Sequence, residues 1–179
     1  MMYVQSGKVT LEYLHPNGNM LIARLVEPGR FFGFREWFAG ECYTVSARTD
    51  DDTRIAMIPL PLIKSLMQEN PNVTSLLMTE LTDAINAGLN HTTFLLQKQL
   101  RGRAAYILLS LKEQFGTRGD GQTLAIYVSR KDMANLSNMT TSNCIRTLSA
   151  FASEGLITIE GRLIRILNEQ MLSDIMRRG

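Results

Sequence analysis

The spacing of hydrophobic and polar residues changes near residue 60. Before that point, short apolar runs alternate with polar turns, and the segments 20–26, 43–47 and 54–58 are predicted to be strands. His15-Pro16-Asn17-Gly18 predicts a hairpin turn, because Asn-Gly is among the strongest hairpin signals. Several short strands with frequent turns favour a small barrel or sandwich.

Beyond residue 60 the apolar residues recur at helical spacing. A short helix is predicted over 61–69. Asn70-Pro71 then caps a helix of about 28 residues, roughly 42 Å long, because no proline intervenes before Leu100. A helix of this length is longer than one small barrel can cover. Its two apolar stripes therefore predict two partners, the barrel and a second copy of the chain. The alternative is a long helix packed wholly within one chain. We assign the homodimer contact to the stripe Val73, Leu77, Leu81, Ala84, Gly88 and Leu95; the second stripe is Leu76, Ile85, Leu89 and Leu96.

The next segments lead to the part of the chain that is richest in motifs. A loop over 116–122 and a short strand over 124–128 are predicted there. They follow an amphipathic helix over 100–115, whose inward residues are expected to be Ala104, Ile107, Leu108 and Leu111.

The pattern over 129–155 is that of a helix-turn-helix. Ser129 begins a Ser-x-x-Asp capping box at the start of a short helix. Ser137-Asn138-Met139 is a tight connection, and Thr140 caps a second helix that ends at Gly155. The inner face of this second helix is predicted to consist of Cys144, Ile145, Leu148, Phe151 and Ala152.

The residue types exposed by this motif suit a DNA duplex. The first turn of the second helix, residues 141–143, is small and polar and can reach base edges in the major groove, while Arg146 can reach a guanine or a phosphate. Residues 156–166 predict a hairpin, the wing. Arg130, Lys131 and Arg162 are expected at phosphates. The candidate DNA-binding residues are Ser129, Arg130, Lys131, Thr140, Thr141, Ser142, Asn143, Arg146 and Arg162. The alternative is a helical hairpin with an ordinary capped surface.

Charge is distributed unevenly along the chain. Residues 1–99 carry 8 Lys and Arg against 10 Asp and Glu, whereas residues 100–179 carry 11 against 7, so the net charge of +2 hides a basic C-terminal part. This excess favours a polyanionic partner, although a solvated charged face is the simpler alternative.

Composition narrows the class of protein. A chain of 179 residues with 45% hydrophobic and 20% charged residues suits one or two soluble, packed domains. No apolar run approaches about 18 residues and no secretory signal is visible, so we expect no membrane association and a cytoplasmic location. Cys42 and Cys144 lie far apart, which excludes a disulfide framework and a four-thiolate cluster. Such lone cysteines are expected to be buried hydrophobic residues rather than redox switches.

Five segments, in this order and spacing, resemble the Crp–Fnr family of bacterial transcription regulators. They are a strand–Ser-Gly–strand element over 3–9, a PGxFFG-like turn over 27–33, an ATVxA-like strand over 44–47, the helix-turn-helix over 129–146 and an EGLI exit over 154–157. The resemblance implies an α+β fold: a β jelly-roll (double-stranded β-helix) sensor domain, a long dimerisation helix and a winged helix-turn-helix. The implied divisions are 1–69, 70–100 and 101–179, and the jelly roll is expected to lack its N-terminal strands.

The chain departs from family members that bind cyclic AMP. These have a Glu after the turn glycine and an Arg-Ser pair before the ATV strand, where this chain has Phe34 and Glu41-Cys42. Because Glu41 would repel a cyclic phosphate and Phe34 accepts no hydrogen bond, the usual cyclic-nucleotide contacts are not expected. Ser142 stands where many relatives have a base-reading Glu, so the operator should differ from the commonest consensus. The effector-pocket residues that the resemblance implies are Phe32, Gly33, Phe34, Glu41, Cys42 and Tyr43.

Enzymatic and cofactor alternatives lack the necessary residues. A cupin metal site needs clustered His and carboxylate ligands, and the β region contains only His15. Neither His15 nor His91 lies in a nucleophile context, and a haem role is less favoured than a surface or interface position. We therefore expect no catalytic residue, no metal and no cofactor.

These observations favour a sequence-specific DNA-binding transcription regulator. It is expected to act as a homodimer on pseudo-palindromic double-stranded DNA, under the control of an unidentified effector, with RNA polymerase as a further partner. The alternative is a dimeric sensor or adaptor that binds a ligand in the jelly roll without regulating genes directly.

Overall fold

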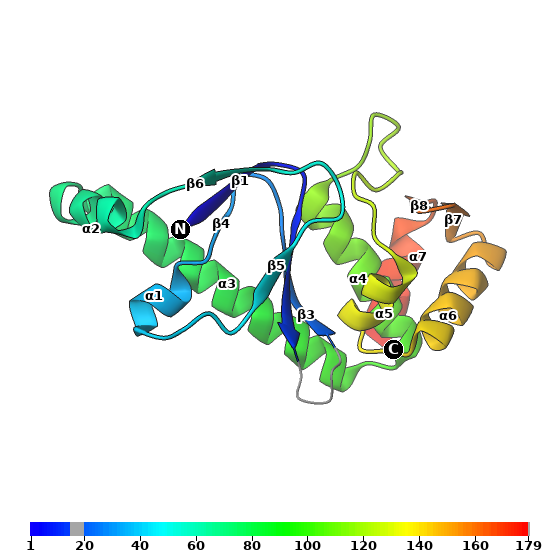
Figure 1. Cartoon of the computed structure of the whole chain (residues 1–179). Coiled ribbons are helices and arrows are strands. Elements are labelled where there is room, and N and C mark those ends of the chain that lie inside the picture. The colour runs from blue at the N-terminus through cyan, green and yellow to red at the C-terminus, as the bar shows by residue number, and fades with distance from the viewer. Residues whose placement is uncertain (15–19, 179) are drawn as a thin grey trace. The chain divides into compact units, whose positions relative to one another are not determined.

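Two three-stranded antiparallel sheets form the first part of the computed structural model, which describes residues 1–14 and 20–178 (Figure 1). One sheet has the strand order β4-β1-β6 and the other β3-β2-β5. The predicted strand over 20–26 is confirmed, and it pairs with β2 on either side of the predicted hairpin turn, which itself lies outside the described residues. The strands are β1 (Met2–Ser6), β2 (Val9–Leu14), β3 (Met20–Val26), β4 (Phe31–Phe32), β5 (Ser46–Arg48) and β6 (Arg54–Met57).

The strand predicted over 43–47 is wrong in its position and length. β5 begins only at Ser46, and its pairing with β2 runs from Glu12 to Thr10. Tyr43 lies before it on exposed chain, where its hydroxyl donates to the Gly33 carbonyl at 3.1 Å. Alternation of apolar residues indicates which side chains face inward, but a strand also needs a neighbouring backbone, and the pairing with β2 stops at Glu12.

Residues from both sheets share one apolar core. Val4, Val9, Val26 and Phe32 are buried together, so the two sheets pack face to face. The Ser6-Gly7 break between β1 and β2 requires glycine, because Gly7 has a φ of +81° and a Cβ there would lie 2.6 Å from the Asp52 carbonyl oxygen.

Besides a second apolar cluster, the N-terminal part contains three helices. They are α1 (Arg35–Ala39), α2 (Leu60–Glu69) and α3 (Pro71–Gln97), the last a single long helix of 27 residues, close to the predicted length. Met1, Phe34, Ile63 and Leu77 form the centre of this cluster. Arg30 adds ion pairs from the turn before β4 to α3, at 3.0 Å from both Glu80 and Asp83.

One stripe of α3 is covered by the chain itself, which corrects the predicted homodimer contact. Leu77 is only 2% exposed, and Val73 and Leu81 pack beside it in the second apolar cluster. Leu77 cannot meet a second copy without leaving the core, whereas Val73 and Leu81 are half-buried. Ala84 and Leu95 are half-buried, and Gly88 is exposed. A different row is exposed on α3, here called the exposed seam: Met78, Ile85, Leu89 and Leu96.

The second half of the chain is mainly helical. The chain divides into two compact units, Met1–His91 and Thr92–Gly179, with the division inside α3. In the C-terminal unit the helix predicted over 100–115 is confirmed, with its four predicted inward residues buried. The elements of this unit after α3 are α4 (Leu100–Phe115), α5 (Arg130–Leu136), α6 (Thr141–Ser153), β7 (Ile157–Glu160), β8 (Leu163–Ile166) and α7 (Glu169–Arg178).

The strand predicted over 124–128 does not form. Leu124, Ile126 and Val128 are buried, as their alternation indicates, but the backbone makes only isolated bridges, Thr117 with Leu124 and Thr123 with Arg165. The alternation correctly identified the inward side chains, whereas a ladder would require a partner strand along the whole segment. Within residues 1–14 and 20–178, no helix combines the length and the apolar character needed to span a bilayer.

Candidate nucleic-acid interface

The first helix of the predicted motif starts as its sequence indicates. The Ser129 hydroxyl accepts a hydrogen bond from the Asp132 amide at 3.0 Å, which satisfies a backbone donor at the start of α5. Met133, Ala134 and Leu136 bury the inner face of this helix. Lys131 is exposed at its start.

A tight turn then fixes the angle between α5 and α6. The buried Ser137 hydroxyl donates to the Met133 carbonyl at 2.6 Å. Asn138 takes a left-handed conformation with a φ of 49°, which asparagine tolerates better than most residues, and the Met139 amide donates back to Ala134 at 2.8 Å. Arg103 of α4 adds a hydrogen bond to the Asn138 carbonyl at 3.2 Å. Sequence reasoning missed Arg103, because no local motif signals a contact between residues so far apart in the chain.

The second helix is capped as predicted, and its predicted inner face is confirmed apart from Ile145 and Ala152, of which Ala152 is half-buried. The Thr140 hydroxyl accepts from the Asn143 amide at 3.2 Å. After the helix, Gly155 takes the left-handed conformation expected of a glycine at this position. Ile145 was predicted on the inner face but is 47% exposed. Thr147, which was not predicted there, is buried. The buried face consists of Cys144, Thr147, Leu148 and Phe151.

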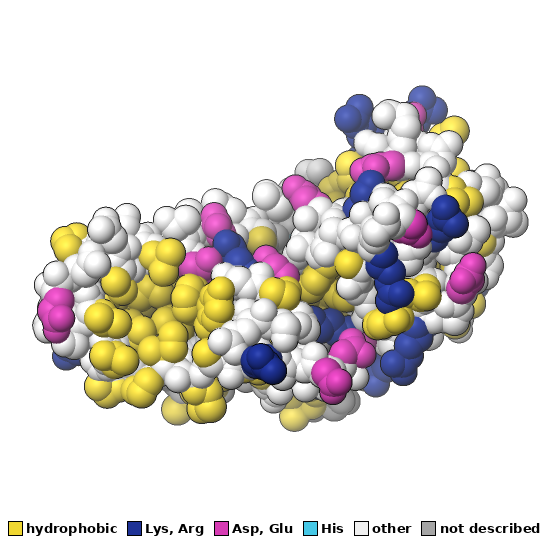
Figure 2. Space-filling view, turned by 90° about the horizontal axis from the view of Figure 1, so that it is seen from above, with side chains coloured by type: hydrophobic (Ala, Val, Ile, Leu, Met, Phe, Trp, Pro, Cys, Tyr) yellow, Lys and Arg dark blue, Asp and Glu magenta, His cyan; other side chains and the backbone are white. Residues whose placement is uncertain are grey.

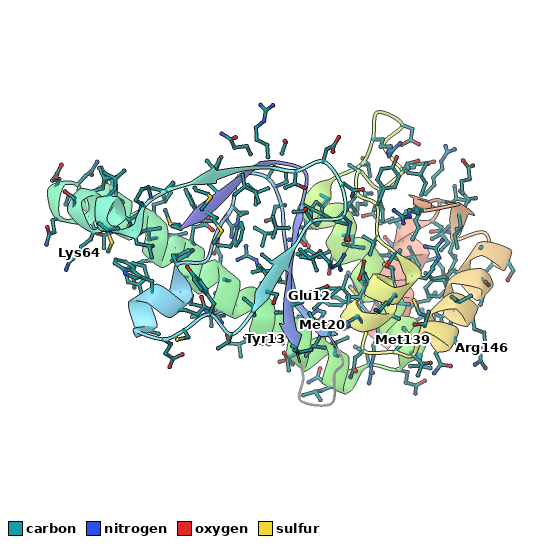
Figure 3. The ribbon with its side chains drawn as sticks, viewed as in Figure 1. Glu12, Tyr13, Met20, Lys64, Met139 and Arg146 are labelled. Carbon is teal, nitrogen blue, oxygen red and sulfur yellow. The ribbon has the colours of Figure 1, made fainter. Side chains whose placement is uncertain are left out.

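The solvent face of α6 carries the predicted base-reading residues. Thr141, Ser142 and Arg146 are exposed, and Figure 3 shows the Arg146 side chain at the outer edge of α6. Asn143 is half-buried, and its side-chain oxygen accepts a hydrogen bond from an Arg146 Nη at 3.1 Å. This bond orients the guanidinium along the exposed face and leaves its remaining N–H groups available to an acceptor.

The hairpin after α6 is the predicted wing. β7 and β8 pair antiparallel from Ile157 with Ile166 to Glu160 with Leu163. Arg162 is exposed at the connecting turn. Arg130, predicted at a phosphate, donates to the Gly161 carbonyl at 3.1 Å and so links the start of α5 to this turn. The structure therefore brings Arg130, the wing tip and α6 into one unit.

A second unpredicted arginine holds α6 on α4. Both terminal nitrogens of Arg101 donate to the Glu154 carboxylate, at 2.8 and 2.7 Å, and the guanidinium lies 4.9 Å from the centre of the buried Phe151 ring. These hydrogen bonds lower the pKa of the Glu154 carboxyl from its ordinary value. Lys112 of α4 forms a further ion pair with Glu169 at the start of α7.

The residues that were expected to form an effector pocket differ in their burial. Phe32 and Phe34 are buried in the two apolar clusters of the N-terminal unit, so each serves as a core residue. Glu41, Cys42 and Tyr43 are exposed on the segment before β5. Gly33 has a φ of +69° and accepts the Tyr43 hydrogen bond. Among the described residues, no group of three His, Cys, Asp or Glu side chains is placed to hold a metal ion.

Comparison with protein families covers both halves of the chain. Residues 102–175 match the Crp-like helix-turn-helix domain, and residues 1–70 match the cyclic nucleotide-binding domain. The chain is 25% identical over 169 residues to the CRP-like cAMP-activated global transcriptional regulator of Mycobacterium tuberculosis, covering 94% of this chain and 75% of that protein.

The fold agrees with solved structures of regulators. A CRP/FNR-family transcriptional regulator from Thermus thermophilus superposes with a TM-score of 0.80 and 26% identity, over 99% of this chain and 88% of the other. FixK2 from Bradyrhizobium japonicum has a TM-score of 0.87 at 22% identity, over 97% and 85% of the two chains.

The chain belongs to the Crp–Fnr family. It is therefore an effector-controlled, DNA-binding transcription regulator, as predicted, and the predicted α+β fold is also confirmed. Members of the Crp–Fnr family are regulators rather than enzymes, and DNA is the partner of its helix-turn-helix domain.

Proposed function

We propose that this Crp–Fnr protein binds pseudo-palindromic double-stranded DNA as a homodimer, with α6 as the recognition helix. The observation that carries the proposal is the exposed, polar start of α6, fixed by the Thr140 cap and by the locked turn at Ser137 and Asn138. A rigid, polar helix start of this kind is what direct readout in the major groove needs.

The polar residues divide into two roles. Thr141, Ser142, Asn143 and Arg146 face the base edges, and Arg146 pairs with a guanine. The basic groups near the edges of this surface contact phosphates, which position the helix without reading sequence. These are Lys131, Arg162 and the nitrogens of Arg130 not bonded to Gly161, while Ser129 and Thr140 act through the backbone that they cap.

The exposed seam of α3 carries the homodimer contact. Met78, Ile85, Leu89 and Leu96 follow one another at intervals of seven, four and seven residues, the spacing of a coiled-coil seam, and each is about half or more exposed. Pairing two such helices around a twofold axis presents two recognition helices to successive major grooves, about 34 Å apart.

The N-terminal unit supplies the effector control. The usual cyclic-nucleotide contacts are not available to it, because Phe34 is committed to the core and Glu41 places a carboxylate where a cyclic phosphate would need a cation. We propose that the effector has another chemistry, that the protein acts in the cytoplasm without catalytic activity, and that RNA polymerase is a partner at the promoter.

Selection of bound duplexes from a random oligonucleotide pool tests this function. The full-length chain should enrich sites with two inverted half-sites whose centres lie about 34 Å, or one helical turn, apart. Enrichment of a single half-site would contradict the homodimer. Failure to shift any duplex at low ionic strength would contradict DNA binding by this surface altogether.

A further inference from the structure

Ile145 is the one large hydrophobic residue of α6 whose side chain is exposed, and it lies beside the proposed reading surface. It is 47% exposed, although a helix residue next to the buried Cys144 was expected in the core. Anchoring of α6 does not depend on it, because the fully buried Leu148 and Phe151 pack that helix onto its unit. The Ile145 side chain is therefore available for a contact outside the core.

Its neighbours on the helix surface are polar. Thr141 precedes Ile145 by four residues and Ser142 by three, so both lie beside it on the same side of α6. Arg146 follows directly and is also exposed. Ile145 thus sits within the surface that enters the major groove, one turn after the start of the helix.

An isoleucine side chain can distinguish bases only by apolar contact, because it has no hydrogen-bond donor or acceptor. In the major groove the apolar group that varies between base pairs is the C5-methyl of thymine. We propose that Ile145 is a specificity-determining residue that contacts a thymine methyl, at a base pair adjacent to the guanine paired with Arg146. This inference rests on the proposed function, and it adds a base identity that the polar residues alone do not predict.

Replacement of thymine by deoxyuridine provides a direct test, because it removes one methyl group and no hydrogen-bonding group. The full-length chain is bound to its selected operator, and each thymine is replaced in turn, symmetrically in both half-sites. Affinity should fall about fourfold for each methyl contact that is lost, at one position of the half-site. This thymine should lie next to the guanine that Arg146 contacts. That guanine is identified as the one whose replacement no longer weakens binding by Arg146→Ala.

Variants at this position tie the effect to Ile145. Ile145→Ala should bind thymine and deoxyuridine duplexes equally, whereas Ile145→Val should retain part of the preference for thymine. Ser153→Ala, an exposed substitution two turns further along α6, should keep the full preference. Because Ile145 is half-exposed, these variants are expected to fold, and circular dichroism checks this.

The outcomes separate this inference from the proposed function. Operator binding that is unaffected by every deoxyuridine, or a preference that persists in Ile145→Ala, would overturn the role of Ile145 while leaving DNA binding intact. A selected operator without thymine beside the Arg146 guanine would also overturn it. Loss of all duplex binding at low salt would instead overturn the proposed function itself.

Discussion

Arg146 and Asn143 act as a pair at the surface of α6. The hydrogen bond of 3.1 Å between them occupies the Asn143 side-chain oxygen, which an asparagine needs for bidentate adenine contact. In this arrangement Asn143 orients Arg146, and both N–H groups of its side-chain amide remain available to acceptors on DNA. Guanine, which presents two acceptors in the major groove, is the base that suits both residues.

Arg146→Ala should relax specificity at one base pair in each half-site. The expected loss is about 1–3 kcal/mol of discrimination for guanine, because the alanine cannot form the bidentate contact. Gel-shift titrations with all four base pairs at each operator position measure it. A loss of equal size on every sequence would show that Arg146 contacts phosphate instead.

The two cysteines should differ in reactivity. Burial raises the pKa of the Cys144 thiol, so little thiolate is present at neutral pH, whereas Cys42 is exposed. One thiol per chain should therefore react rapidly with a disulfide reagent at neutral pH in the folded protein, and both should react after unfolding in urea. Cys42→Ser should abolish the rapid phase. A rapid phase that survives this substitution would contradict the burial of Cys144.

At the scale of single elements, local sequence signals predicted the ends of two helices correctly but failed for two strands. The capping residues Ser129 and Thr140 and the exit glycine Gly155 marked the ends of α5 and α6, because caps satisfy backbone groups within a few residues. The alternating pattern over 43–47 and 124–128 failed, because a strand depends on a partner that is distant in sequence. The inward direction of Ile145 was also misjudged, since it lies near the edge of the buried face of α6.

Thr140→Ala should destabilise the C-terminal unit by about 1 kcal/mol, because the Asn143 amide loses its acceptor. The midpoint of urea unfolding followed by circular dichroism measures this effect. Thr140→Ser keeps the hydroxyl and should remain close to the parent protein. Thr141 lies one residue further on and is not the capping residue, so Thr141→Ala should cause no comparable loss of stability.

Leu89→Asp should separate the proposed dimer into monomers, because it places a charge in the apolar exposed seam. Analytical ultracentrifugation at micromolar concentration gives the oligomeric state. Asn90→Asp introduces the same charge at an exposed neighbour outside the seam and serves as the control. A dimer that persists in Leu89→Asp would place the contact on another surface.

At the scale of the whole molecule, hydrophobic and basic side chains are unevenly distributed over the face drawn in Figure 2. Figure 2 shows hydrophobic side chains gathered over the end of the N-terminal unit that carries α2, while Lys and Arg side chains are spread over the C-terminal unit. Within the N-terminal unit, the Arg30 ion pairs with Glu80 and Asp83 tie α3 to the turn before β4.

DNA affinity should fall steeply with salt, as expected when phosphate contacts release counterions. A plot of log affinity against log salt concentration gives the number of these contacts. Lys131→Ala should lower the slope by about one for each half-site and weaken all sequences alike. An unchanged slope would exclude Lys131 from the phosphate contacts.

The sequence by itself determined the local architecture of this protein: the long α3, the capped α5 and α6, the wing and, through its motifs, the family. The helices, their caps and the wing depend on interactions between residues close in the chain, and the family is identified from local motifs. Residue type and spacing therefore suffice to predict them. Only the tertiary structure decided which stripe of α3 is covered, that Ile145 is exposed, and that Arg101 and Arg103 hold the helix-turn-helix. Such outcomes depend on which distant surfaces meet, because burial and long-range hydrogen bonds are properties of the packed chain.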